Sequence, residues 1–218
     1  MAKRAVVLLS GGIDSATTLY LAKDKGFSPY CLIFDYGQRH SREIESAKRI
    51  AKEAGCRYLI CKINLPWKGS SLLDKKKRIP RRGRGIPSTY VPARNTIFLS
   101  FALSFAEAIR AEVIFIGANA IDFSGYPDCR PRFYYAFRKV ICCGTKAGVE
   151  KREIKIRTPL IWKTKAQIIK LGQSLGVPYE LTWSCYRGKK KPCGICDSCR
   201  FRANGFLEAD LKDPLMVA

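Results

Sequence analysis

The chain has 218 residues, with 40 lysines and arginines against 18 aspartates and glutamates, which gives a formal net charge of +22 at pH 7. This length can bury one sizeable hydrophobic core and carry a small appendage. No stretch approaches the ~20 consecutive apolar residues of a membrane span, and residues 1–4 lead into an apolar strand rather than a cleavable signal. The sequence therefore predicts a cytoplasmic protein with no membrane partner, and its charge favours anionic ligands.

A short apolar run, two glycines and a predicted helix start form the most informative motif. Its members are Leu9, Ser10, Gly11, Gly12, Ile13, Asp14, Ser15, Ala16, Thr17 and Thr18. Glycine takes positive φ at little cost, so the backbone can approach a ligand closely, and the N–H groups of a helix start favour an anion such as pyrophosphate. Asp14 and Ser15 are predicted to cap the helix. The motif lacks both the lysine of a P-loop and the glycine spacing of a dinucleotide site.

The pattern Ser-Gly-Gly-x-Asp-Ser resembles the motif of the ATP-pyrophosphatase, or PP-loop, families. That resemblance implies cleavage of ATP between the α- and β-phosphates, with AMP left on an oxygen of the substrate. Carboxylate and amide oxygens are poor leaving groups, and adenylation turns them into good ones. An ordinary strand, turn and helix is the plain structural alternative.

Short apolar runs alternate with amphipathic stretches, a pattern typical of a parallel sheet covered by helices on both faces. Strands are predicted at residues 5–9, 30–34, 58–62, 113–117 and 153–156. Helices are predicted at residues 15–25, 41–54, 95–110, 131–146 and 164–175. The expected fold class is α/β, with a doubly wound, mostly parallel sheet that is Rossmann-like and similar to the adenine nucleotide alpha hydrolase-like fold. The basic residues 65–92 are predicted to form a mobile loop over the site.

Ligands of doubly wound sheets bind beyond the carboxyl ends of the strands, where three clusters of functional residues fall. The first follows the second strand and contains Asp35, Tyr36, Arg39 and His40; the second, at a helix start, is Arg94 and Asn95. The third follows the fourth strand and contains Asp122, Ser124, Tyr126, Asp128, Cys129 and Arg130. A solvated turn is the alternative for the first cluster, above all for His40. Loops as dense in functional groups as the third are more often sites than spacers.

Four cysteines near the end of the chain have the spacing of a metal site: Cys185, Cys193, Cys196 and Cys199. Four thiolates are the ligand set of a tetrahedral structural zinc, which leaves no coordination position for catalysis. An iron–sulfur cluster and a redox Cys-x-x-Cys pair are the alternatives. The expected organisation is an ATP-binding α/β domain at residues 1–180 and a zinc-binding segment at residues 181–218 packed on it.

Taken together, the motifs resemble the 7-cyano-7-deazaguanine synthase family nearly end to end. The matching segments are residues 10–15, 34–40, 91–95, 122–130 and 158–160, with Lys165 and the four cysteines. The chain departs from the family at Ala93, where glycine is usual, and in the basic residues 75–84 and those before Cys193. The extra methyl of Ala93 is predicted to alter affinity or substrate choice if this position needs positive φ or lies against a ligand.

The resemblance implies that 7-carboxy-7-deazaguanine and ammonia are converted to 7-cyano-7-deazaguanine (preQ0), a precursor of queuosine and archaeosine. ATP adenylates the carboxylate, ammonia displaces AMP to give an amide, and a second adenylation with loss of water gives the nitrile. Mg²⁺ would bridge the polyphosphate, with Asp14 a candidate contact, and one structural Zn²⁺ is expected per chain.

Individual roles also follow from the resemblance. Catalytic residues are expected to be Asp14, Ser15, Arg94, Arg130 and Lys165. ATP is expected to contact the motif from Leu9 to Thr18 together with Asp35, Tyr36 and Arg39. The deazaguanine ring is expected to contact Asn95, Asp122, Ser124, Tyr126 and Asp128.

The family resemblance suggests a homodimer, and the charge of residues 75–84 makes them a candidate RNA contact. A PP-loop tRNA sulfur transferase, making thiouridine or thiocytidine, is the strongest competing function. It would need a persulfide-carrying cysteine near the nucleotide, such as Cys129. A zinc-ribbon RNA-binding protein with a relic phosphate loop is the non-enzymatic alternative. No RNA-binding module of the RRM or KH type is recognisable, which favours the synthase.

Overall fold

A computed structural model describes residues 2–39, 41–74, 76–78, 85–120, 125–188 and 190–215. Its five strands form one sheet in the order β3-β2-β1-β4-β5, and every neighbouring pair is parallel. The strands are β1 (Lys3–Leu8), β2 (Phe27–Asp35), β3 (Arg57–Lys62), β4 (Val113–Ile116) and β5 (Lys155–Arg157). The predicted α/β class with a doubly wound parallel sheet is confirmed.

Seven α-helices and two 3₁₀ turns are described. The helices are α1 (Ile13–Asp24), α2 (Arg42–Glu53), α3 (Arg94–Ala108), α4 (Pro131–Gly144), α5 (Lys146–Val149), α6 (Lys165–Ser174) and α7 (Asp197–Glu208). The 3₁₀ turns are η1 (Pro127–Cys129) and η2 (Tyr179–Leu181). Within the described residues, no helix has the length and apolarity needed to cross a membrane.

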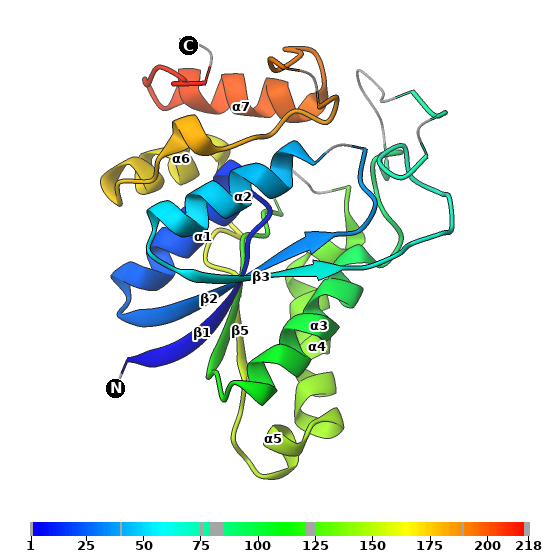
Figure 1. Ribbon diagram of the computed structural model, residues 1–218, viewed down its shortest axis with the longest axis vertical. Coiled ribbons are helices and arrows are strands. Elements are labelled where there is room, and N and C mark those ends of the chain that lie inside the picture. Colours follow the sequence, from blue (N-terminus) through cyan, green and yellow to red (C-terminus); the bar gives the residue numbers. More distant parts are fainter. Residues whose placement is uncertain are drawn as a thin grey trace.

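Helices cover both faces of the sheet (Figure 1): α1, α2, α6 and α7 lie on one side, and α3, α4 and α5 on the other. Successive residues of β1 point to opposite cores. Ala5 and Val7 pack in the first, and Val6 and Leu8 in the second. Because these four residues are buried, each of them is apolar, as expected for a central parallel strand.

The strand order fixes the place of the site. β1 pairs with β2 on one side and with β4 on the other. The connections that leave toward these neighbours lie on opposite faces, so the winding reverses between β1 and β4. A crevice opens at the carboxyl ends of the strands at such a reversal, and ligands bind there. Residues 9–12, after β1, and 117–120, after β4, therefore flank it.

The predicted capping roles of Asp14 and Ser15 are wrong. The helix begins two residues earlier than predicted, at Ile13, and its N-cap is Gly12, which makes no side-chain capping bond. The Ser15 hydroxyl lies inside the first turn and donates to the Gly12 carbonyl at 3.1 Å. Both side chains are thereby placed on the helix itself, where α1 meets the crevice.

One helix prediction needs correction, and one helix was missed. The predicted helix at residues 131–146 divides at Thr145, whose extended backbone ends α4 and whose side chain accepts a bond from the Gly148 N–H to start α5. Helix α7 was not predicted, since it contains the poor helix formers Asn204 and Gly205. It packs against α6 beside the sheet (Figure 1).

The prediction that residues 65–92 form a mobile loop is wrong for several of the described residues. Ser70, Ser71 and Leu72 are buried, and Leu72 belongs to the second core. The N–H of Ser71 donates to the carbonyl of Ser88 at 2.8 Å, and the Leu72 N–H donates to the Ser70 hydroxyl at 3.1 Å. These bonds satisfy the backbone groups that burial removes from water. Most of the basic stretch 75–84 lies outside the described residues.

Ala93 has a backbone φ of 52° at the N-cap of α3, so the position does take the left-handed conformation that glycine favours. That conformation costs an L-residue about 1 kcal/mol. We expect Ala93→Gly to raise the free energy of unfolding by about that amount. In the matched control Ala203→Gly, at an exposed position of helix α7, stability should fall by about 1 kcal/mol. Urea denaturation measures the stability of both variants. A lower midpoint for Ala93→Gly than for the wild type would contradict the left-handed conformation of Ala93.

Candidate active site

A cavity of about 260 Å³ opens at the predicted crevice. It is lined by the loops at the carboxyl ends of the strands and by residues that follow α6. Its volume is close to the lower end of small-molecule sites, roughly 300 Å³. Eleven of the predicted residues line it: Leu9, Ser10, Gly12, Ile13, Asp14, Ser15, Tyr36, Arg94, Asn95, Tyr126 and Lys165.

Close packing against α2 shapes the loop after β1. Gly11 has a φ of 84°, and a Cβ atom there would lie 2.4 Å from the Glu43 carbonyl oxygen and 2.8 Å from the Ala47 nitrogen. Only glycine fits this position. The N–H and the hydroxyl of Ser10 donate to the Ser15 hydroxyl oxygen at 3.2 and 3.1 Å. The loop is thus held against the start of α1, where the helix dipole favours a phosphate.

Lys165 and Asp14 form an ion pair at the cavity wall, although 150 residues separate them in the sequence. The ammonium of Lys165, at the start of α6, donates to both carboxylate oxygens of Asp14 at 2.6 and 2.8 Å. Their side chains are only 10% and 17% exposed. The Lys165 ammonium, held in place by Asp14, is a cation beside the loop, which has no lysine of its own.

A second cluster of side chains surrounds Arg94, at the start of α3. Its guanidinium donates to the Tyr36 hydroxyl at 3.3 Å and lies over the Tyr36 and Phe98 rings, 5.9 and 6.0 Å from their centres. Arg94 also acts electrostatically on Tyr126 and Glu43. The predicted clusters after β2 and β4 therefore meet at this arginine.

Glu43 lines the same cavity and was missed by the sequence reasoning. It lies in the first turn of α2, where an acidic residue is ordinarily explained by the helix dipole. Burial raises the pKa of its carboxyl group to about 7, and the charge of Arg94 opposes the rise. Other lining residues missed from the sequence include Phe98, Ser184 and Tyr186.

Asn95 and Asp128 build the wall between α3 and the loop after β4. The Asn95 N–H donates to the Asp128 carboxylate at 3.1 Å, so Asp128 satisfies the start of α3. The Asn95 amide donates to the Asp128 carbonyl at 3.0 Å and to the Cys129 sulfur at 3.6 Å. Asn95 and Cys129 line the cavity. Asp122 and Ser124, predicted to bind the substrate ring, lie outside the described residues, as does His40.

Other predicted site residues lie off the cavity. Thr17 is fully buried and its hydroxyl bonds the Ile13 carbonyl at 2.9 Å, while the Thr18 hydroxyl donates to the Asp14 carbonyl at 2.8 Å. Arg39 donates from its guanidinium to the Asp74 carbonyl at 3.0 Å. The remaining predicted residues that do not contribute to the described lining are Gly11, Ala16, Asp35, Asp128 and Arg130.

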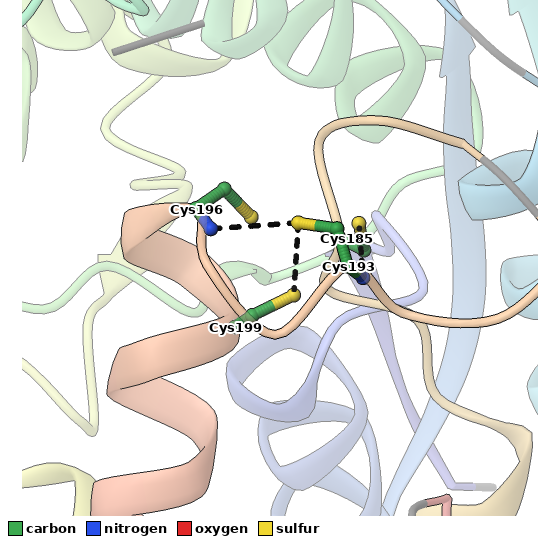
Figure 2. Close-up of side chains that lie close together, drawn as sticks. All are labelled: Cys185, Cys193, Cys196 and Cys199. Atoms are coloured by element: carbon green, nitrogen blue, oxygen red, sulfur yellow. Dashed lines mark hydrogen bonds between the residues drawn. The ribbon is translucent and has the colours of Figure 1, made fainter. Parts of the chain in front are cut away.

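The four cysteines converge as the spacing predicts (Figure 2), with their sulfurs all within 4.8 Å of one another. The Cys193 and Cys199 sulfurs are 3.9 Å apart. A tetrahedral zinc with Zn–S bonds of about 2.3 Å places its sulfurs about 3.8 Å apart, so this donor set fits one zinc ion. Hydrogen bonds from Cys196 and Cys199, then from the Arg187 and Cys193 N–H groups, lower the pKa of Cys185, which favours the thiolate that a metal needs.

The cysteine cluster is tied to the phosphate loop through Trp183. The Trp183 N–H donates to the Gly11 carbonyl at 2.9 Å, and its indole N–H donates to the Cys185 carbonyl at 3.0 Å. The guanidinium of Arg42 lies 4.8 Å from the centre of the indole ring. Ordering the cysteine segment therefore also orders one wall of the cavity.

Known proteins match both the sequence and the fold. The family model for "Queuosine biosynthesis protein QueC" matches residues 4–210. The chain is 52% identical over 221 residues to a 7-cyano-7-deazaguanine synthase from Trichodesmium erythraeum, covering 98% of this chain and 100% of that one. It is 51% identical over 220 residues to a 7-cyano-7-deazaguanine synthase from Thermoplasma volcanium, and the match covers 99% of this chain and 91% of that one.

Among solved structures, a 4-thiouridine synthetase bound to RNA and ATP is similar in fold, with a TM-score of 0.53 at 21% identity, covering 95% of this chain and 50% of that one. The likeness shows a shared fold and no more. The sequence matches are far closer and span nearly the whole chain. The chain belongs to the QueC family of 7-cyano-7-deazaguanine synthases, ATP-dependent ligases of preQ0 biosynthesis.

Proposed function

We propose that this one cavity activates the same carboxylate carbon of 7-carboxy-7-deazaguanine twice, with the residues assigned as follows. The loop of residues 9–15 and Lys165 hold the ATP phosphates, and the group around Arg94 and Tyr126 holds the deazaguanine. The observation that carries the proposal is the meeting of the Lys165–Asp14 pair with Arg94 in one cavity. Both cations can offset the charge that develops when pyrophosphate leaves.

The chemistry is the same in both halves of the reaction. A carboxylate oxygen attacks the α-phosphate, pyrophosphate leaves, and ammonia then displaces AMP to give the amide. The amide oxygen attacks a second ATP in the same way. Loss of AMP and of the two N–H protons leaves the nitrile, so each oxygen of the original carboxylate departs on one AMP.

Asp14 is the described residue that best fits a Mg²⁺ ion accompanying ATP. Its carboxylate lines the cavity beside the loop, and carboxylate and phosphate oxygens are the ligands that Mg²⁺ prefers. When bound there, Mg²⁺ supplies positive charge to the polyphosphate. The Lys165 ammonium donates to both oxygens of this carboxylate and so fixes its orientation.

Sulfur transfer is less consistent with the cavity. Burial raises the pKa of Cys129 to about 11, which keeps this residue a neutral thiol at pH 7. A sulfur carrier acts as a thiolate or persulfide anion and is normally found where its pKa is depressed. Cys129 is therefore better explained as an acceptor for the Asn95 amide.

Incubation with ATP, Mg²⁺, ammonia and 7-carboxy-7-deazaguanine tests the proposal. Mass spectrometry should detect the nitrile, and chromatography should detect AMP. Release of AMP only when tRNA is added, without nitrile, would point to the sulfur transferase instead.

Several expectations remain predictions. They are the division into an ATP-binding domain at residues 1–180 and a zinc-binding segment at residues 181–218, a homodimer, a cytoplasmic location and RNA contact through residues 75–84. The zinc segment as described contributes Trp183 and Tyr186 to the cavity. This supports the expectation that the segment packs on the ATP-binding part.

A further inference from the structure

Glu43 carries a carboxyl group, lines the reaction cavity and has no role in the proposed function as set out above. Its helix turn packs on the phosphate loop, since a Cβ atom on Gly11 would meet the Glu43 carbonyl oxygen at 2.4 Å. Glu43 lines the cavity together with Arg94 and Tyr36, and it interacts electrostatically with both. The Lys165–Asp14 pair contributes to the same lining from α6 and α1, so a nucleotide on the loop and the Glu43 carboxyl group share one space.

The proposed reaction contains a step that needs a base. At neutral pH dissolved ammonia is almost entirely ammonium, which has no lone pair and cannot attack the adenylated carbon. A carboxylate in the cavity can bind ammonium by charge and take its proton at the place where ammonia is used. Among the described lining residues, the carboxylates are Asp14 and Glu43. The proposed function already uses Asp14 beside the phosphates with Lys165, whereas Glu43 lies on α2 and interacts electrostatically with Arg94.

We propose that Glu43 is the catalytic base that takes a proton from ammonium and delivers ammonia to the adenylated carboxyl carbon. The inference rests on the proposed function and adds the source of the nucleophile. In the balanced step, ammonium gives one proton to the Glu43 carboxylate, and the freed lone pair forms the C–N bond. The C–O bond to AMP breaks and its electron pair leaves on the AMP phosphate. The added nitrogen loses a proton to solvent, and Glu43 later returns its own proton to solvent.

The surroundings of Glu43 support this role. Among the described residues, those that act electrostatically with it include Arg94 from α3, Tyr36 after β2 and Tyr186 from the cysteine segment. Burial raises the pKa of Glu43 to about 7, with Arg94 opposing. A base works best when its pKa is near the operating pH. Below pH 7 the group is mostly protonated and cannot accept a proton, and above pH 7 it is mostly a carboxylate.

The test compares Glu43→Gln with wild type in three assays. Exchange of labelled pyrophosphate into ATP, dependent on 7-carboxy-7-deazaguanine, reports adenylation without ammonia. Amide and nitrile formation report the step with ammonia. Hydroxamate formation with hydroxylamine, which is mainly uncharged at neutral pH, reports capture of the adenylate by a nucleophile that needs no prior deprotonation. Glu45→Gln, an exposed residue of the same helix paired with Lys48, is the matched control.

We expect Glu43→Gln to keep exchange and hydroxamate formation within about threefold of wild type and to lose about 100-fold in the ammonia step. Glu45→Gln should behave as wild type in all three assays. Ammonia activity like that of wild type in Glu43→Gln would overturn the inference, and so would equal losses in all three assays. Absence of exchange in the wild type would instead refute the proposed function.

A pH profile of the wild type, compared with that of Glu43→Gln, tests the same inference. At constant total ammonium, the wild-type ammonia step should rise through pH 7 and then level off. In Glu43→Gln the rate should follow the concentration of free ammonia throughout, with no plateau. If Glu43→Gln fails to fold, judged by lost zinc, Glu43→Asp and the wild-type profile decide. A wild-type rate without a plateau, or a Glu43→Asp enzyme with full ammonia activity and no pH dependence near 7, would overturn the role.

Discussion

Replacing Lys165 with methionine is expected to lower the rate of adenylation by about 1,000-fold, as loss of one well-placed charge at a reacting phosphate does. The substitution removes the cation beside the phosphate loop and leaves the Asp14 carboxylate, 17% exposed, without this partner. Breaking a pair this buried is also expected to cost about 3 kcal/mol of stability. Pyrophosphate exchange measures the first effect, and urea denaturation measures the second.

Two further variants separate the catalytic effect from the loss of stability. Lys170→Met, an exposed residue on the same helix, should leave both quantities unchanged. The double variant Asp14→Asn with Lys165→Met removes the unpaired charge and should regain stability without regaining exchange. A Lys165→Met enzyme that folds and exchanges pyrophosphate at the wild-type rate would exclude Lys165 from the reaction.

Replacing Cys196 with serine is expected to remove zinc and unfold the cysteine segment together. Cys196 is buried, and its sulfur is one of four that lie within 4.8 Å of one another. Metal binding supplies the folding free energy of such sites, so a three-thiolate remnant should lose most of its affinity. Because Trp183 joins this segment to Gly11, nitrile formation should fall as well.

The matched control for this substitution is Cys142→Ser, since Cys142 is exposed on α4 and does not belong to the cluster. It should keep zinc, stability and activity. Zinc content is measured by atomic emission and folding by thermal melting. A Cys196→Ser protein that is zinc-free, stable and fully active would show that the metal has no structural role.

The central layout could be predicted from sequence because local patterns encode it directly. The apolar run of β1, the glycines after it and the cysteine spacing each correspond to one local structure. The strand order then places their ends at one edge of the sheet. The place of Lys165 in the site followed only from the family resemblance. Its ion pair with Asp14 was not predicted, since nothing local in the sequence signals a contact across 150 residues.

The residues that sequence reasoning missed share a physical cause. Glu43 looks like an ordinary acidic residue at a helix start, and its place in the cavity arises only from the packing of the α2 backbone on the phosphate loop. Asp128 and Asn95 look like ligands for a substrate, but much of their bonding capacity is used on each other. Polar side chains near a site can therefore be found by pattern, whereas their partners are set by the fold.

The transfer of labelled oxygen tests the central claim, that the same carbon is activated twice by adenylation. With 7-carboxy-7-deazaguanine carrying ¹⁸O in both carboxylate oxygens, mass spectrometry of the products follows each oxygen. The account predicts two AMP molecules per nitrile, each with one ¹⁸O, and none in water or pyrophosphate. Label found in water, or in only one AMP per nitrile, would contradict it.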